Sequence, residues 1–203
     1  MTIFFICFVV WALLHSLTAA STLKEFFRQR LGTRVADGLY RLAYNLFAIG
    51  TFLPVLYLAA TQLPHTLLWA IPDPFRAAAF LVQGIGAVGL LVSLSQTDVW
   101  DFLGVRQALG LLTGEDASAR PPELVTSGVY AFVRHPLYFF SLLVIWFTPT
   151  MTLNTLIFNV LVTLYFWIGA YYEERRLAAF FGEEYQNYQR SVPRLFPRRL
   201  IRR

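Results

Sequence analysis

Apolar residues along this chain gather in long blocks rather than at the regular spacing of a soluble amphipathic fold. Four blocks contain no Asp, Glu, Lys or Arg, and they cover roughly residues 2–20, 42–62, 77–97 and 151–172. Each block has about the 20 residues that a helix needs to cross roughly 30 Å of hydrocarbon. The pattern therefore predicts four membrane-spanning helices.

A fifth, shorter apolar block runs from Leu137 to Thr148 and lies between Pro136 and Pro149. As a helix it is only about 18 Å long, and the block at 151–172 follows it at once. We predict a helical hairpin over 137–172, whose first arm begins below the usual membrane boundary. The residues just before this arm are then expected at the depth of the lipid headgroups.

The segment after the hairpin has a different pattern. Between residues 173 and 190, apolar and aromatic residues recur at helical spacing, at Leu177, Phe181, Tyr185 and Tyr188. Such a pattern predicts an amphipathic helix that lies on the cytoplasmic surface or caps the helix bundle.

The composition supports a membrane protein. Of the 203 residues, 57% are hydrophobic and only 14% are charged, against about 25% charged in a typical soluble domain. We expect an all-α integral membrane fold in one domain with about five transmembrane helices. Its parts are three N-terminal spans within 1–97, a cytoplasmic segment at 98–136, the hairpin at 137–172, and a cytoplasmic C-terminal helix and tail at 173–203.

The basic residues predict the orientation. With five spans, 16 of the 17 Lys and Arg residues fall on one side of the membrane, and only Arg76 falls on the other. Because basic residues accumulate on the cytoplasmic side, we expect the N-terminus outside and the C-terminus in the cytoplasm, in a bacterial inner membrane. A basic surface that faces anionic lipid headgroups accounts for the net charge of +5 without nucleic acid. No obligate protein partner can be inferred.

The first apolar block has a second interpretation, as a cleaved signal peptide, because Thr18–Ser21 loosely resembles a cleavage site. However, no Lys or Arg precedes the apolar run, and the basic cluster follows it. That charge order is the reverse of a secretory signal, so we interpret residues 2–20 as a retained span.

Three glycines in the third block match the spacing G-x-G-x-x-G, at Gly84, Gly86 and Gly89. A dinucleotide-binding site needs a preceding strand and a helix that begins at the glycines. Here the glycines lie in the middle of a predicted span, where small residues allow close packing of helices. We therefore predict a packing role.

His15 in the first predicted span and Asn45 in the second are polar residues at membrane depth. Polar groups at membrane depth usually face the interior of the bundle and often mark function. A side chain that only donates a hydrogen bond to a neighbouring helix fits each position equally well, so both interpretations stay open.

The last third of the chain carries the residues with most chemistry. Arg134 and His135 stand at the start of the hairpin, and Glu173 and Glu174 follow its second arm. Because the two ends of a hairpin meet, we expect these side chains to lie close together. A purely structural ion pair between Arg134 and one of the two glutamates is the alternative.

These residue types fit S-adenosylmethionine, which carries a sulfonium, an ammonium, a carboxylate and an adenine ring. An arginine can bind the carboxylate through two parallel hydrogen bonds, and acidic residues can bind the ammonium and the ribose. Aromatic faces attract the sulfonium and stack on adenine. The last third offers such aromatic residues at Tyr130, Tyr138 and Tyr172.

The runs SGVYAFVRHPLY at 127–138 and YEERRLAAFFGEEYQNYQRSVP at 172–193 resemble the membrane methyltransferases related to isoprenylcysteine carboxyl methyltransferase. That group includes bacterial phospholipid N-methyltransferases and methanethiol S-methyltransferases, and the resemblance covers about residues 125–197. It implies that the C-terminal half binds S-adenosylmethionine from the cytosol and that a lipophilic or small acceptor enters from the bilayer. The N-terminal half differs between subgroups, so the acceptor stays open between a thiol, a carboxylate, a lipid amine and a phenol.

The resemblance and the residue chemistry together define a predicted site without a metal. Arg134 and Glu174 are the predicted catalytic residues, and His15 and Asn45 are expected on the acceptor side. The predicted cofactor-binding residues are Tyr130, Arg134, His135, Pro136, Tyr138, Glu173 and Glu174. The alternative function is that of a b-haem or quinone electron carrier, with His15 and His135 as axial ligands. Cys7 is the only cysteine, so we predict no intrachain disulfide and no cysteine-based metal site.

Overall fold

A computed structural model describes residues 1–114 and 123–197. Five of the arginines that enter the predicted topology lie outside these ranges, namely those at 120, 198, 199, 202 and 203. By their contacts, the residues form two compact units. The first unit consists of Met1–Leu63 and Asp98–Pro122, and the second of Pro64–Thr97 and Glu123–Arg203.

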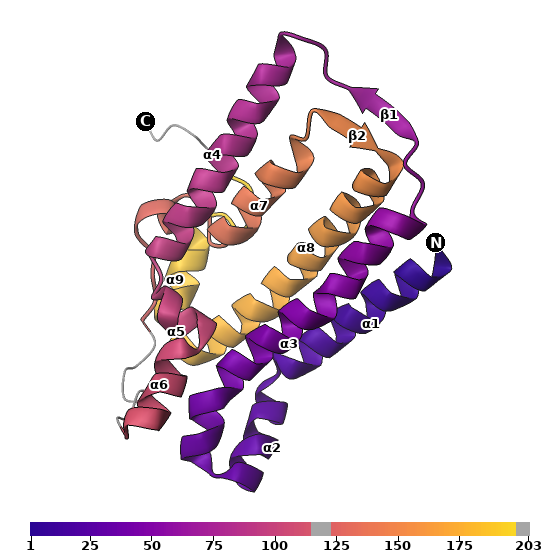
Figure 1. Cartoon of the computed structure of the whole chain (residues 1–203). Helices are drawn as coiled ribbons and strands as arrows, with labels where there is room; N and C mark the ends of the chain where they lie inside the picture. Colours follow the sequence, from indigo (N-terminus) through magenta and orange to yellow (C-terminus); the bar gives the residue numbers. More distant parts are fainter. Residues whose placement is uncertain (115–122, 198–203) are drawn as a thin grey trace. The chain divides into compact units, whose positions relative to one another are not determined.

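The first unit is helical throughout its described residues, and Figure 1 labels its elements. They are α1 (Thr2–Thr18), α2 (Ser21–Leu31), α3 (Thr33–Gln62), α5 (Val99–Leu103) and α6 (Val105–Thr113). Helix α3 is the centre of this unit, because α1, α2 and α6 all pack against it.

The second unit contains helices and two short strands (Figure 1). Its elements are β1 (Leu67–Ala70), α4 (Phe75–Ser95), η2 (Gly128–Ala131), α7 (Pro136–Trp146), β2 (Thr150–Thr152), α8 (Leu153–Phe181) and α9 (Glu183–Ser191). The closest helix pair is α4 with α7.

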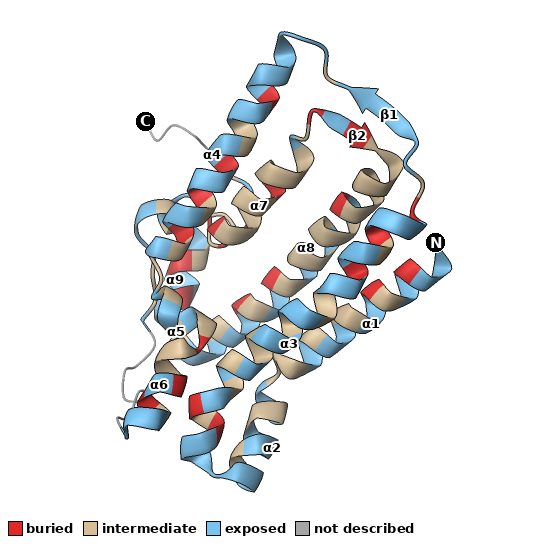
Figure 2. Cartoon of the chain, in the orientation of Figure 1, coloured by how far each residue is buried: buried red, intermediate tan, exposed pale blue. Residues whose placement is uncertain are grey.

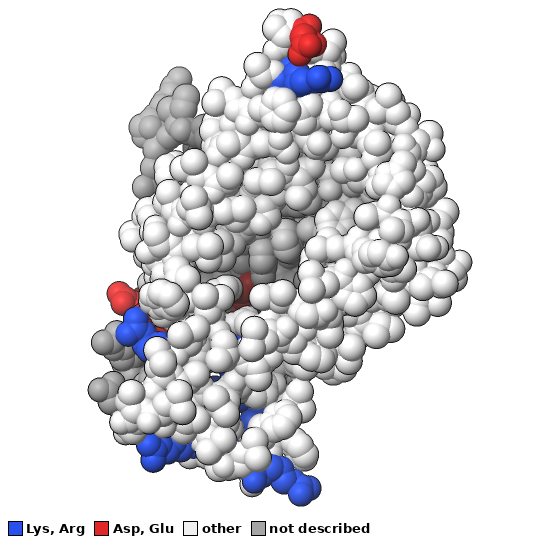
Figure 3. Space-filling view, in the orientation of Figure 1, with Lys and Arg blue, Asp and Glu red and all other residues white. Residues whose placement is uncertain are grey.

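Three helices, α3, α4 and α8, are long and apolar enough to cross a membrane, and α1 with α2 forms a fourth candidate that bends by 58°. Their apolar sides are exposed: only 6% of the apolar window of α3 is buried, and pale blue positions run along the helices in Figure 2. In Figure 3 the helix sides on the visible face are almost free of Lys, Arg, Asp and Glu. Apolar surfaces of this extent are covered by lipid in a stable protein. The predicted all-α integral membrane fold is therefore confirmed, whereas the number of five spans stays a prediction.

The short block predicted at 137–148 forms helix α7, which has 11 residues and is too short to span a membrane alone. Its last carbonyl groups have no partner within the helix, and neighbouring helices supply one. The amide of Gln83 on α4 donates to the carbonyl of Val144 (2.7 Å), and the amide of Asn159 on α8 donates to that of Ile145 (2.7 Å). A helix can end inside an apolar environment when its carbonyls are satisfied in this way.

The chain continues from α7 into a strand, which the hydrophobic pattern did not predict. Strand β2 pairs with β1 in an antiparallel sheet that matches Leu67 with Thr152 and Ala70 with Thr150. The backbone NH of Ile71 also donates to the carbonyl of Pro149 (2.8 Å). This pairing satisfies backbone groups between the two arms of the hairpin, where a helix is absent.

The glycines of the G-x-G-x-x-G pattern pack helices together, as predicted. A Cβ atom on Gly86 would lie 2.9 Å from Cγ2 of Val144, and one on Gly89 would lie 2.2 Å from the ring of Phe140. Both contacts join α4 to α7. A Cβ on Gly84 would meet nothing within 4 Å, so close packing depends on the other two glycines.

Helix α8 continues through the boundary predicted at residue 172 and ends at Phe181. The chain then turns at Gly182, whose φ of 60° lies in the left-handed region, where glycine is favoured. The predicted amphipathic helix therefore begins at Glu183 as α9. Glu173 and Glu174 do not end the helix because, as described below, their side chains find partners beside it.

Candidate active site

The predicted site residues of the last third belong to the second unit and contact one another near the N-terminal end of α7, the helix labelled in Figure 1. Two backbone hydrogen bonds place the C-terminal segment, Val192–Pro197, beside this end. The NH of Arg134 donates to the carbonyl of Pro193 (2.9 Å), and the NH of His135 donates to that of Arg194 (3.1 Å).

The 3-10 turn η2 holds Tyr130 near this site. The backbone NH of Val129 donates to Oε1 of Gln96 (3.0 Å), and the Tyr188 hydroxyl donates to the carbonyl of Tyr130 (2.6 Å). Gly128 makes the turn possible, because its φ is 59° and a Cβ there would lie 1.8 Å from Nε2 of Gln96. Burial, together with the charge of Glu173, raises the pKa of Tyr130 to about 12, so its hydroxyl stays neutral.

One group of side chains, which we name the Glu174 cluster, consists of Arg134, Glu174, Gln189 and Arg194. Arg134 donates to Oε1 of Glu174 through Nε (2.8 Å), and its Nη2 lies 2.7 Å from the same oxygen. Arg194 donates to Oε2 through Nε (3.0 Å), and its Nη2 lies 2.9 Å from that oxygen. Gln189 also donates to Oε2 (3.2 Å). Only 3% of the Glu174 side chain is exposed, so this carboxylate is buried and fully hydrogen-bonded.

Arg134 is engaged along its whole guanidinium group. Its Nε and Nη2 atoms contact Glu174, and its Nη1 atom donates to the carbonyls of Gln189 (2.9 Å) and Val192. Its side chain is 8% exposed. The structure therefore contains the ion pair that sequence analysis left open as the alternative, and this pair joins α7, α8, α9 and the C-terminal segment.

The second group, the Glu173 cluster, consists of His135, Tyr138 and Glu173. The Tyr138 hydroxyl donates to Oε2 of Glu173 (3.0 Å), and Nδ1 of His135 lies 3.4 Å from the same oxygen. The Tyr138 ring stacks on the His135 ring, at 5.3 Å between centroids. Unlike Glu174, Glu173 keeps 37% of its side chain exposed.

His135 lies between the two glutamates. Nδ1 contacts Glu173, and Nε2 contacts Oε1 of Glu174 at 3.2 Å. Burial lowers the pKa of His135, but the hydrogen bonds and charges of the two glutamates outweigh it and raise the pKa above its ordinary value. Because carboxylates occupy both ring nitrogens, neither is available as an axial haem ligand.

Pro136 and the rings around it fix the geometry. Pro136 stands in the first turn of α7, where its missing NH costs no helical hydrogen bond. The Tyr138 ring, which stacks on His135, also stacks on the ring of Phe166 of α8, at 4.6 Å between centroids. The hydroxyl of Tyr138 is therefore held toward Glu173.

Sequence analysis did not identify Arg194 and Trp167. The guanidinium carbon of Arg194 lies 6.0 Å from the ring centroid of Trp167, within reach of a cation–π interaction, and the Trp167 residue is 51% exposed. Trp167 and Glu174 are seven positions apart on α8 and so lie on the same helix face. This spacing was the available signal, but it identifies a site only when the position of the C-terminal segment is known.

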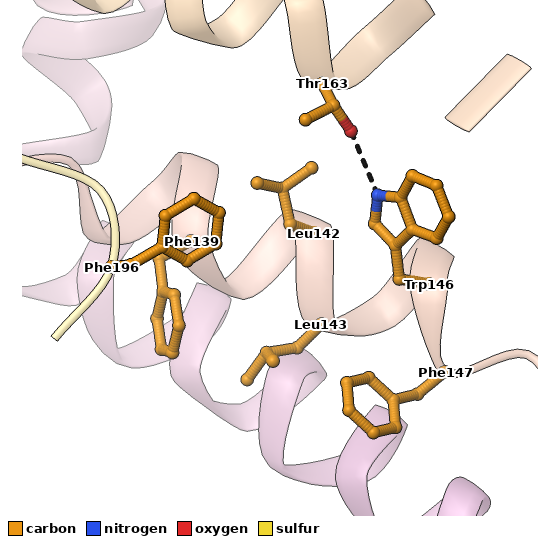
Figure 4. A pocket seen from close by; sticks show the side chains of 7 residues that line it. All are labelled: Phe139, Leu142, Leu143, Trp146, Phe147, Thr163 and Phe196. Atoms are coloured by element: carbon orange, nitrogen blue, oxygen red, sulfur yellow. Dashed lines mark hydrogen bonds between the residues drawn. The ribbon is translucent and has the colours of Figure 1, made fainter. Parts of the chain in front are cut away.

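An apolar hollow of about 300 Å³ lies along α7 in the same unit (Figure 4). The indole NH of Trp146 donates to the hydroxyl of Thr163 (2.9 Å) at its edge. Phe196, from the segment that carries Arg194, lies near Phe139 in this view. The residues that line the hollow are Phe139, Leu142, Leu143, Trp146, Phe147, Thr163 and Phe196.

The two residues predicted on the acceptor side belong to the first unit. Nε2 of His15 lies 2.7 Å from the Tyr44 hydroxyl. The amide of Asn45 donates to the carbonyls of Phe102 and Leu103 (3.0 Å each), at the end of α5. Both side chains thus bridge helices of their own unit, and their role toward an acceptor stays a prediction.

Among residues 1–114 and 123–197, no group of three or more His, Cys, Asp or Glu side chains is placed to hold a metal ion. The described donors at the site are guanidinium, imidazole, hydroxyl and carboxylate groups. They fit an organic ligand that carries both positive and negative charges.

The chain belongs to the phospholipid methyltransferase family, whose pattern matches residues 82–184. The matched range contains the Arg134, His135 and Tyr138 positions and both glutamates, so the resemblance found in the sequence is confirmed. No solved structure shows a significant match to the chain.

Named relatives include two proteins of Bradyrhizobium diazoefficiens. Methanethiol S-methyltransferase 1 is 32% identical over 93% of this chain and 64% of its own length. Methanethiol S-methyltransferase 2 is 32% identical over 96% of this chain and 72% of its own length. Protein-S-isoprenylcysteine O-methyltransferase of Schizosaccharomyces pombe is 40% identical, but over only 36% of this chain and 33% of its own length. The chain therefore spans less than two thirds of the first of these relatives.

Proposed function

We propose that this protein transfers a methyl group from S-adenosylmethionine to a small thiol such as methanethiol, in a bacterial inner membrane. The observation that carries the proposal is the pair of adjacent clusters on α8. There a half-exposed carboxylate, a guanidinium and an exposed indole lie within a few turns of one another. Membership in a methyltransferase family and the names of the two Bradyrhizobium relatives support it.

The charged groups of S-adenosylmethionine fit these side chains. The Glu173 carboxylate suits the ammonium or the ribose hydroxyls, and the exposed Trp167 ring suits the sulfonium or the adenine. A guanidinium group of the Glu174 cluster suits the carboxylate. When bound, S-adenosylmethionine supplies an electrophilic methyl group.

The reaction is an in-line displacement. The acceptor sulfur forms a bond to the methyl carbon while the bond from that carbon to the sulfonium sulfur breaks, and the thiol proton is released to solvent. The products are a thioether and S-adenosylhomocysteine. Because no other bond changes, the residues of this chain contribute mainly by holding the reactants in line and excluding water. In this account Arg134 and Glu174, the predicted catalytic residues, act by positioning.

The proposed topology is the one that the basic residues predict, with the N-terminus outside and the C-terminus in the cytoplasm. The cofactor then reaches the N-terminal end of α7 from the cytosol. Protease protection of a tag at each terminus of the full chain tests this orientation.

A second candidate acceptor is a lipophilic molecule, such as a lipid amine or the carboxylate of a prenylated cysteine. The apolar hollow beside α7 is the observation that favours it. The hollow has a volume of about 300 Å³, and its lining is almost wholly apolar. A methanethiol molecule would fill only a small part of this volume.

The test uses the purified full chain in detergent with methyl-labelled S-adenosylmethionine. Methanethiol, phosphatidylethanolamine and a farnesylated cysteine analogue are offered as acceptors in parallel. Labelled dimethyl sulfide as the main product is the expected result. Label only in lipid or in the prenylated acceptor would replace the thiol by the second candidate, and no transfer to any acceptor would contradict the proposed function.

A further inference from the structure

We propose that Arg194, rather than Arg134, binds the carboxylate of the methyl donor. The inference rests on the proposed function, because it presumes that S-adenosylmethionine is the ligand. It assigns a binding role to a residue that sequence analysis did not identify as part of the site.

Each of the three guanidinium nitrogens of Arg134 already contacts an oxygen of the protein. Nε donates to Glu174 and Nη2 lies 2.7 Å from the same carboxylate oxygen, while Nη1 donates to two backbone carbonyls, those of Gln189 and Val192. Its side chain is almost wholly buried. To bind a ligand carboxylate through two nitrogens, Arg134 would have to give up contacts to α8, to α9 or to the C-terminal segment, and such a loss leaves buried polar groups unsatisfied.

Arg194 differs on each of these points. It contacts Glu174 through Nε and Nη2, and within residues 1–114 and 123–197 its Nη1 forms no hydrogen bond. Its side chain is 30% exposed. It lies over the Trp167 ring, so its guanidinium is oriented at a surface that a ligand can reach. A guanidinium held on two of its nitrogens is a preorganised donor for an anion.

The charge of the Glu174 cluster also favours an anion. Two guanidinium groups share the single carboxylate of Glu174, which leaves one positive charge without a matching negative charge inside the cluster. The uncompensated charge is best placed on the more exposed of the two arginines, since a buried unpaired charge is costly. A ligand carboxylate at Arg194 would balance it.

The half-exposed Glu173 completes the recognition. In S-adenosylmethionine the ammonium and the carboxylate are bonded to the same carbon atom. Glu173 and Arg194 both lie beside Glu174, the one as its neighbour in sequence and the other as its partner. A carboxylate and a guanidinium carry the charges that the ammonium and the carboxylate of an amino acid require.

The test compares two ligands that differ only by the carboxylate, S-adenosylmethionine and decarboxylated S-adenosylmethionine. Calorimetry on the full chain in detergent, without acceptor, measures the dissociation constant of each. We expect Arg194→Gln to weaken binding of S-adenosylmethionine by about 10- to 100-fold, as for a lost hydrogen bond between charged groups. Binding of the decarboxylated ligand should change by less than about twofold.

Two further variants keep the test decisive. Arg190→Gln is the matched control, because Arg190 is exposed on α9 and bonds only Asn187 in its surroundings, and it should change neither constant. Arg194→Lys retains the charge toward Glu174 but not the planar fork, so it should weaken S-adenosylmethionine alone, by less than Arg194→Gln. It replaces Arg194→Gln if that variant does not fold.

The other outcomes overturn the inference. If the Arg194 variant binds both ligands equally less tightly than wild type, Arg194 is a purely structural partner of Glu174. If both dissociation constants are unchanged, Arg194 is not part of the binding site. A wild-type chain that binds neither ligand would refute the proposed function itself, and this result is distinct from the other two.

Discussion

Glu173 and Glu174 are consecutive residues on α8, yet their surroundings differ in almost every respect. Successive side chains on a helix point about 100° apart, so Glu174 faces the C-terminal segment and Glu173 faces α7. Glu174 is buried and receives hydrogen bonds from two arginines, a glutamine and His135. Glu173 is half-exposed and contacts only His135 and Tyr138 among the side chains described above.

The difference separates stability from binding. A buried carboxylate with every lone pair occupied holds helices together, and removing one partner leaves the others unpaired. A half-exposed carboxylate that is fixed by a tyrosine and a histidine is oriented toward whatever fills the space beside it. We therefore propose that Glu174 stabilises the fold and that Glu173 binds the ligand, although a sequence motif treats them as a pair.

The largest expected effect is that of Glu174→Gln. Loss of this charge leaves two guanidinium groups without their common partner, so we expect the free energy of unfolding to fall by about 3–5 kcal/mol. Thermal unfolding in detergent, followed by far-ultraviolet circular dichroism, measures it. Glu184→Gln, at an exposed position of α9, is the matched control and should lie within about 0.5 kcal/mol of wild type. A Glu174→Gln protein as stable as this control would break the comparison.

A smaller effect concerns His135, which lies between the two glutamates. Its pKa is raised in the folded state, so its protonated form stabilises the fold. This contribution is fully present below the unfolded pKa of about 6.5 and is lost as the pH rises through the raised folded-state pKa. At acidic pH we expect the free energy of unfolding of wild type to be about 1.5–3 kcal/mol larger than that of His135→Gln, as for hydrogen bonds between charged groups.

The measurement is the unfolding temperature of both proteins from about pH 6 to pH 9, a range that brackets ordinary histidine titration. The difference between them should shrink as the pH rises. A difference that stays constant or grows with pH would show that His135 acts in its neutral form. The charged groups that face His135, namely Arg134, Glu173 and Glu174, all stay intact in this comparison.

A third prediction concerns the hydrogen bond that Tyr138 donates to Glu173. Tyr138→Phe removes the hydrogen bond to Glu173 but keeps the ring that stacks on His135 and Phe166. We expect a loss of about 0.5–1.5 kcal/mol in stability and weaker binding of S-adenosylmethionine, because Glu173 is no longer held in place. Tyr57→Phe, at a residue of α3 that is 68% exposed, is the control for both measurements. Unchanged affinity in Tyr138→Phe would show that Glu173 needs no such support.

Much of the fold follows from the hydrophobic pattern, because a helix in lipid must be long, uncharged and internally hydrogen-bonded. The pattern located α3, α4 and α8, and it indicated that α7 is short. It did not reveal how α7 ends, since the side chains of Gln83 and Asn159 bond the carbonyls of α7 only across helices. The strands were missed for the same reason: their pairing joins residues far apart in the chain.

The site was predictable from motifs as a set of residues but not as a division of roles. The Arg134 and Glu174 positions match a recognisable pattern, and their contact is a consequence of the hairpin. Arg134 is buried among oxygens of the protein while Arg194 is more exposed, and this difference depends on the path of the C-terminal segment beside α7. Charge and spacing alone contain no information on that path.

The smallest expected change in stability belongs to Glu173→Gln, and it tests the central claim most directly. The unfolding temperatures of wild type, Glu173→Gln and Glu174→Gln are measured with and without S-adenosylmethionine. A ligand at 100 times its Kd stabilises the protein it binds by about 2.7 kcal/mol. We predict that Glu173→Gln lowers the unfolding temperature of the unliganded protein much less than Glu174→Gln does, but that it loses most of the shift caused by the ligand. A Glu173→Gln protein that retains the full ligand-induced shift, or that is as unstable as Glu174→Gln, would contradict the separation of the two glutamates.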